Sequence, residues 1–365
     1  MKARSFAHVI LLVLALGACM APGAVNAPNF PATERTATVT TDPMTGWALR
    51  SPQALAIYYG WPSAALVTAN AGGPVAQGLA RYATVVLGAG LAQPDHPDHA
   101  GSRALIARSR EAGAEVYGYL DMGISTQPRP PSLAELAVDI DLWKALGVTG
   151  IFWDDAGYEF AGGLDYSSYR QRAASLVELT HKAGLRAFVN VWEPDQLFGA
   201  TGPDGTAVPP VGLGPDDLVL AESWFVTDGR YVDGVVWQRR AEKLAAYRGQ
   251  QPFRLACVAT GPVGPGVEAS DRYQAAYWAS VIYGCDFFQY TDPRYSAEPG
   301  AGGNRIFYYA GSDITPGDLL AGRVTVVQEE SGWRFVRRTQ LGEIVVATDG
   351  DQRGYGRYRR SETGS

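Results

Sequence analysis

Short apolar runs, each ending in polar or aromatic residues, recur along the chain from residue 54 to residue 292. Runs that are apolar throughout are typical of strands buried on both faces, as in a parallel sheet. The eight runs occupy residues 54–61, 82–88, 115–121, 151–155, 186–192, 218–224, 254–260 and 287–292. They recur at intervals of roughly 30 residues, which suits strand–helix units. The pattern predicts an α/β fold, a (β/α)8 TIM barrel, with a doubly wound sheet of about six to eight strands as the alternative.

Segments with helical character separate most of these runs. They lie near residues 100–112, 133–146, 166–183, 234–247 and 270–283. Ser132 and Glu135 have the spacing of a capping box at the start of the second segment. Gly113, Gly147 and Gly184 follow three of the segments, where glycine commonly ends a helix. The alternation of strand and helix signals therefore favours the barrel.

The pattern changes after Pro293. Four further runs, at residues 305–309, 323–328, 333–337 and 343–347, are separated by turn residues such as Gly332 and Gly342. They predict a small antiparallel β appendage within residues 296–348. Residues 349–365 are polar and rich in Arg and Gly, so we expect a disordered tail there.

The first eighteen residues have the pattern of an export signal. Lys2 and Arg4 precede an apolar core, Val9–Leu16, which is too short to span a bilayer. Residues 16–19 read Leu-Gly-Ala-Cys, which resembles a bacterial lipobox and predicts removal of residues 1–18 and a lipid on Cys19. An ordinary signal peptide with a chance cysteine is the alternative. Met20, in place of Asp, favours the outer membrane or cell surface.

The region after Cys19 is expected to tether the lipid to the folded part. Residues 19–50 are rich in Pro, Ala and Thr, as in flexible linkers, and residues 51–295 would form the barrel domain. Removal of residues 1–18 takes away two cations and no acid, so the formal net charge changes from −6 to −8. An excess of acids argues against nucleic acid or anionic lipid as the main partner. We expect a monomer that meets the membrane through its lipid.

Two cysteines remain in the predicted barrel. Cys257 and Cys285 would suit a disulfide in an oxidising envelope. Each also lies in an apolar run, where buried free thiols are common. Both possibilities stay open at this point.

Acidic residues at the ends of two predicted strands are the main candidates for chemistry. The fourth run ends in Asp154 and Asp155, and the sixth carries Glu222. An Asp in this position could instead cap a helix or form a turn. However, barrel enzymes place their catalytic residues at the carboxyl ends of strands, and glycosidic bonds are cleaved by pairs of carboxyl groups. We therefore predict that these three acids are catalytic.

Aromatic and polar residues at other strand ends would hold the substrate. They are Tyr58, Trp61, Asp121, Asn190, Trp192, Trp224 and Tyr290. Aromatic rings stack on the C–H faces of sugars, and carboxyl groups bind sugar hydroxyls, so this mixture predicts a polysaccharide substrate. One acid must be protonated while another is ionised, and crowding of acids separates their pKa values in this way. The sequence leaves open which acid donates the proton and whether the mechanism is retaining or inverting.

Other chemistries find less support. The chain has neither a G-x-S-x-G elbow nor a Walker A loop. We expect no cofactor and no metal. One alternative is a non-catalytic barrel that binds glycan or assists envelope assembly. The other is a metal-dependent hydrolase that uses Asp95, His96 and His99.

Several of these motifs resemble those of a known group of barrels over roughly residues 54–293. They are Tyr58-Tyr59-Gly60-Trp61, Gly118-Tyr119-Leu120, Gly150-Ile-Phe-Trp-Asp-Asp155 and Glu222. The group is the spherulin-4-like and endo-α-1,4-polygalactosaminidase-like glycoside hydrolases. The resemblance implies that Asp154, Asp155 and Glu222 are catalytic or substrate-holding acids, and that the substrate is an α-1,4-linked polysaccharide containing galactosamine. A Glu often stands in that group where this chain has Asp155.

Overall fold

The computed structural model describes residues 42–64, 78–295, 307–309, 311–312, 314–349 and 353–361. The predicted signal segment and Cys19 lie outside these residues. Of the predicted tether, residues 42–50 are described, and they belong to the folded unit. Met44 and Leu49 are buried, and Asp42 forms an ion pair with buried Arg337. The tether prediction is therefore wrong for residues 42–50, because two apolar anchors and an ion pair hold this segment.

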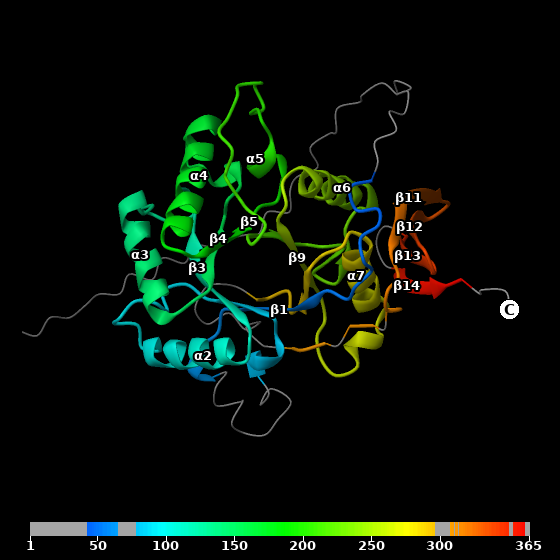
Figure 1. Ribbon diagram of the computed structural model, residues 1–365, viewed down its shortest axis with the longest axis horizontal. Coiled ribbons are helices and arrows are strands. Elements are labelled where there is room, and N and C mark those ends of the chain that lie inside the picture. The colour runs from blue at the N-terminus through cyan, green and yellow to red at the C-terminus, as the bar shows by residue number, and fades with distance from the viewer. Residues whose placement is uncertain are drawn as a thin grey trace, which may run out of the picture. The chain divides into compact units, whose positions relative to one another are not determined.

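Eight parallel strands close into a barrel, which confirms the predicted fold and excludes the open sheet (Figure 1). Closure is direct, since Gln53 of the first strand pairs with Phe287 of the last. The order around the barrel is β1-β10-β9-β6-β5-β4-β3-β2. The strands are β1 (Gln53–Tyr58), β2 (Thr84–Leu87), β3 (Glu115–Asp121), β4 (Gly150–Asp154), β5 (Arg186–Asn190), β6 (Leu218–Ala221), β9 (Arg254–Thr260) and β10 (Phe287–Thr291). A two-stranded ribbon, β7 (Val226–Thr227) and β8 (Arg230–Tyr231), follows β6.

Helices connect most of the strands. They are α2 (His99–Glu111), α3 (Leu133–Leu146), α4 (Tyr166–Lys182), α5 (Asp195–Phe198), α6 (Gly234–Gln250) and α7 (Asp271–Ile282), with short 3-10 turns η1 (Gly78–Arg81), η2 (Tyr158–Phe160) and η3 (Val267–Ala269). The predicted capping box of Ser132 and Glu135 starts α3, and Gly147 ends it in the left-handed conformation. None of the helices within the described residues is both long and apolar enough to cross a bilayer.

The strands separate two hydrophobic cores. One fills the barrel lumen and includes Phe152 and Phe188, and the other lies between the strands and the helices and includes Ile151 and Trp153. Successive residues of a strand point to opposite faces. A shift of one position therefore moves a side chain from the lumen to the outer core, which decides which strand-end residues can line a site.

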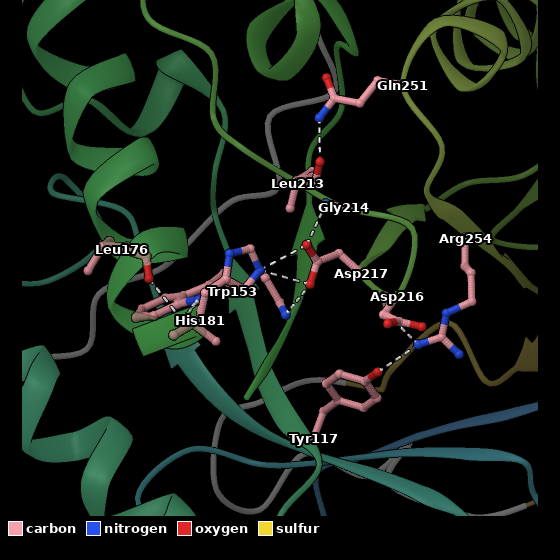
Figure 2. Close-up of polar contacts among 12 residues, drawn as sticks. Tyr117, Trp153, Leu176, His181, Leu213, Gly214, Asp216, Asp217, Gln251 and Arg254 are labelled. Carbon is pink, nitrogen blue, oxygen red and sulfur yellow. Dashed lines mark hydrogen bonds and ion pairs between the residues drawn. The ribbon is translucent and has the colours of Figure 1, made fainter. Parts of the chain in front are cut away.

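Charged residues occupy the amino end of the barrel. Glu115, at the start of β3, forms ion pairs with Arg186 and Arg254, which start β5 and β9. Figure 2 shows Asp217, just before β6, in contact with His181 and with the backbone of Gly214. These contacts tie the strand starts together and leave the carboxyl end for a binding site.

The predicted antiparallel appendage is present as a four-stranded sheet. Its strands are β11 (Leu320–Glu329), β12 (Gly332–Thr339), β13 (Gly342–Thr348) and β14 (Gly354–Arg360), in that order. In Figure 1 these strands appear as the orange to red arrows beside α7. Phe335 packs against Phe225 and Trp237, which joins the sheet to the outer core of the barrel.

Two predictions for this region are wrong. Residues 307–309 of the expected first strand are outside the sheet, and residues 354–360 of the expected disordered tail form β14. A side chain on Gly356 would collide with the backbone of α7, so glycine allows the strand to pack closely there. Tyr358 stacks on Trp278 and donates a hydrogen bond to Asp318. The Arg- and Gly-rich composition of this segment gave no indication of these packing contacts.

Cys257 of β9 and Cys285, just before β10, form a buried disulfide. The bond closes a loop with a sequence separation of 28 residues that contains α7. We predict that the double variant Cys257→Ala/Cys285→Ala loses about 3 to 4 kcal/mol of unfolding free energy, because the loop is no longer closed in the unfolded chain. Urea denaturation measures this loss, with wild-type protein reduced while unfolded as the matched control. An unchanged denaturation midpoint in both samples would contradict the prediction.

Candidate active site

Four of the predicted residues meet at the carboxyl end of the barrel. Asp154 ends β4 and Asp155 follows it, Asn190 ends β5, and Glu222 follows β6. Asp155, Asn190 and Glu222 line a cavity of about 220 Å³. Its walls are formed by Asp155, Gly157, Glu159, Phe160, Asn190, Val191, Trp192, Glu222 and Arg240. Carboxyl groups from two strands therefore share one mouth, together with an aromatic side chain.

Asp154 is the most firmly held of the acids. Its Oδ1 accepts hydrogen bonds from Asn190 Nδ2 at 2.7 Å and from the Asp155 backbone N–H at 3.0 Å, and the Tyr119 hydroxyl also donates to it. Burial, and then the charge of Glu222, raise the pKa of Asp154 to about 6, while the bonds from Asn190 and Tyr119 act in the opposite direction. Asp154 is thus an oriented carboxylate at neutral pH.

Asp155 differs in conformation and in protonation. Its φ of 52° lies in the left-handed region, which Asp tolerates better than most residues. Burial raises the pKa of Asp155 to about 8, and the charges of Asp154, Asp121 and Glu222 add to this effect. Two neighbouring acids in the chain therefore have separated pKa values, as acid–base chemistry requires.

Glu222 is hydrogen-bonded by a tyrosine from the loop after β10, the last barrel strand. The Tyr295 hydroxyl donates a 2.6 Å hydrogen bond to Glu222 Oε1. The Tyr295 ring stacks on Tyr59, with ring centroids 6.0 Å apart, and Tyr59 meets the edge of Tyr119. A layer of tyrosines thus lies between the lumen core and the carboxyl groups.

Backbone strain concentrates around these acids. Among the described residues other than glycine, four have positive φ, namely Asp155, Ser223, Phe225 and Asp228. One follows β4 and three follow β6, so all lie beside the two candidate acidic positions. Such conformations cost free energy and persist where the surrounding structure enforces them, which is common at functional sites.

The sequence prediction missed the tyrosines and Arg240. Tyr59 is part of the motif Tyr58–Trp61, but the prediction chose Tyr58 and Trp61 from it. Strand alternation puts Tyr59 on the lumen side and Tyr58 in the outer core, where its hydroxyl donates to the Trp61 carbonyl. The period of two along β1 was the available signal. No pattern in the sequence connects Tyr295 or Arg240 with Glu222.

Three residues that were predicted to bind substrate are buried, so the prediction is wrong for them. Tyr58 is 6% exposed, Trp224 is fully buried against Trp237 and Tyr283, and Tyr290 is 2% exposed beneath Tyr273. All three pack in the core outside the strands. An aromatic residue near a strand end can support a helix as readily as it can face the mouth, so residue type alone misassigned them.

The remaining predicted contacts are accessible to different degrees. Trp192 is 47% exposed and lines the cavity, whereas Trp61 is 51% exposed and lies beside the ring of His96. Asp121 accepts bonds from the Gly123 backbone and from Thr126, so it also fixes the loop after β3.

The structure offers no support for the metal-dependent alternative. The His96 ring instead accepts a hydrogen bond from the Asp98 backbone N–H. Across the described ranges, no group of three or more His, Cys, Asp or Glu side chains is arranged to hold a metal ion.

Comparison with known proteins gives structural similarity alone. No family model matches the chain, and no curated protein is similar to it. An α-galactosidase of Saccharomyces cerevisiae in complex with raffinose has a TM-score of 0.50 and 12% identity, covering 86% of this chain and 76% of that chain. The glycoside hydrolase domain of PelA from Pseudomonas aeruginosa has a TM-score of 0.44 and 18% identity, covering 66% and 96%. Eubacterium rectale Amy13B has a TM-score of 0.46 and 8% identity, covering 84% and 87%.

At 12% identity, the similarity to the α-galactosidase shows the fold alone. These similarities do not single out the spherulin-4-like group. The functional argument therefore depends on the residues of the site.

The raised pKa of Asp155 predicts a pH-dependent cost to stability. The folded protein keeps a proton that the unfolded chain releases above pH 3.8, so stability falls as pH rises from there to about 8. Asp155→Asn keeps a residue that tolerates positive φ and removes the charge. We expect it to stabilise the protein by roughly 1 to 2 kcal/mol at pH 8, after allowance for solvent screening, and by nothing near pH 4.

Denaturation midpoints across this pH range test the prediction. Asp204→Asn is the control, because hydrogen bonds from Thr206 lower the pKa of Asp204, so this change should not stabilise the protein at pH 8. Equal stability of wild type and Asp155→Asn at pH 8 would show that Asp155 is not held in a charge-disfavouring site.

Proposed function

We propose that the chain is a glycoside hydrolase in which Asp154 and Glu222 form the catalytic pair. One observation carries the proposal. Carboxyl groups at the ends of β4 and β6 lie at one barrel mouth, where Asn190 of β5 donates a hydrogen bond to Asp154 and lines the same cavity as Glu222. Paired carboxyl groups that influence each other, beside an exposed Trp192, provide what cleavage of a glycosidic bond needs.

The hydrogen bonds suggest how the roles are divided. Asp154 accepts bonds from Asn190, Tyr119 and its neighbour's backbone, which orient it as an anion toward the anomeric carbon. It would act directly as a nucleophile or through a water as a base. Glu222 would then give its proton to the leaving oxygen. Asp155, protonated at neutral pH, would donate a hydrogen bond to a sugar hydroxyl.

The finer proposal concerns the polysaccharide. Asp121 and Asp155 lie near each other at the mouth, and Glu159 lines the same cavity as Asp155. Negative charge at the mouth attracts cationic sugars. Together with the resemblance of the motifs to polygalactosaminidase-like barrels, this supports an α-1,4-linked, partly deacetylated galactosamine-containing chain as the substrate.

Hydrolysis is tested with soluble protein that starts at residue 42, the first residue that the structure describes. We expect oligosaccharides, detected by mass spectrometry, from partly deacetylated α-1,4-galactosaminan within a panel of polysaccharides. Glu222→Gln and Asp154→Asn should each lower kcat at least about 100-fold, because each removes a group that acts in the transition state.

Two variants on the outer helices control for non-specific effects. Glu178→Gln and Asp139→Asn change the same residue types on α4 and α3 and should retain full activity. Products from all four variants at wild-type rates would contradict the assignment of the pair. Binding of glycan without any product from wild-type protein would favour the non-catalytic alternative.

We also propose that a lipid on Cys19 anchors the enzyme to the bacterial envelope. The lipobox-like residues 16–19 support this, and the buried disulfide suits an oxidising compartment. The full-length protein should partition into the membrane fraction of a bacterial host, and Cys19→Ser should move it to the soluble fraction. Equal partitioning of the two proteins would rule out anchoring at Cys19.

A further inference from the structure

A buried arginine on α6 joins three parts of the candidate site. Arg240 is 8% exposed, and its guanidinium donates hydrogen bonds to the carbonyls of Glu222 and Val191, the latter at 3.2 Å. The guanidinium carbon also lies 4.3 Å from the centroid of the Trp192 ring. One side chain therefore links the segment after β6, the segment after β5 and the exposed aromatic residue of the cavity.

The surroundings of Arg240 differ from those expected of a structural ion pair. Its hydrogen-bond acceptors among the described residues are carbonyl groups, and no described carboxylate lies within ion-pair distance. Its positive charge interacts with the charges of Glu222 and Glu193, which lie in the segments after β6 and β5. Burying a cation without a paired carboxylate costs free energy, which the two carbonyl hydrogen bonds and the contact with the Trp192 ring offset.

Arg248, two helical turns further along α6, provides an internal comparison. It is also 8% exposed, stacks on a tryptophan, Trp47, and donates to a carbonyl, that of Gly284. Arg248 differs in having a carboxylate partner, Asp286, which lies just before β10 at the amino end of the barrel. Helix α6 thus carries one arginine, Arg248, that is paired with a carboxylate at the amino end of the barrel. It carries another, Arg240, that has no ion pair and lies at the candidate site.

We infer that Arg240 is a positioning residue, which holds the Trp192 ring and the Glu222 segment in fixed alignment. The inference rests on the proposed function. A sugar stacked on the exposed face of Trp192 would be held in a fixed position relative to the carboxyl group of Glu222, because one guanidinium contacts both segments. Displacements of about 1 Å at such a site can cost 100-fold in rate.

Three variants separate positioning from folding. Arg240→Met keeps most of the packing volume but removes the charge and both hydrogen bonds. Arg240→Lys keeps the charge and removes the planar stack and the two-pronged contact. Arg248→Met is the matched control at the amino end.

Steady-state kinetics on the polysaccharide that the wild type cuts provide the first measurement. We expect kcat/KM to fall 10- to 100-fold for Arg240→Met, with its pH profile moved to higher pH because a cation facing Glu222 is lost. Arg240→Lys should keep the wild-type pH profile but raise KM, since the ring loses its support. Arg248→Met should lower the melting temperature and leave kcat/KM within twofold of wild type.

The second measurement is a crystal structure of Arg240→Met, which does not depend on activity. We expect the Trp192 ring and the Glu222 side chain to shift from their wild-type positions. If the wild type is active but Arg240→Met keeps its kcat/KM and pH profile, the inference is overturned while the proposed function stands. If the wild type cuts nothing, the proposed function fails, and the crystal structure alone decides: unmoved Trp192 and Glu222 side chains overturn the positioning role, and displaced ones support it.

Discussion

Closure of the barrel by pairing of β1 with β10 is the constraint on which the rest of the structure depends. A closed parallel sheet gives every strand a lumen face and an outer face, and it brings all the carboxyl ends to one side. Residues as distant in sequence as Tyr59 and Tyr295 become neighbours only through this closure. The candidate acids share a mouth because only β5 separates β4 from β6 in the sheet, although these two strands lie more than sixty residues apart in the chain.

The two ends of the barrel use charge in opposite ways. At the amino end, acids are matched by cations, as Glu115 is by Arg186 and Arg254. At the carboxyl end, burial raises the pKa values of Asp154 and Asp155, the charge of Glu222 adds to both effects, and Arg240 contacts two carbonyl groups and the Trp192 ring. Burial and like charge disfavour ionisation, so stability is given up where separated pKa values are useful.

The sequence was sufficient for the strands and most helices, because apolar runs and caps are local signals. Ser132 and Glu135 specify the start of α3 whatever surrounds them. Side-chain direction was harder to predict. Tyr58, Trp224 and Tyr290 stand near strand ends but support the outer core, because one step along a strand reverses the face. Strand β14 escaped prediction because its glycines allow close packing on α7, a contact that depends on the tertiary structure.

A crystal structure of the Glu222→Gln variant with a bound oligosaccharide tests the account most directly. The account predicts a sugar stacked on the exposed face of Trp192, with its anomeric carbon between the carboxylate of Asp154 and residue 222. Oligosaccharide bound elsewhere on the protein, with the cavity between Asp155 and Trp192 empty, would contradict it.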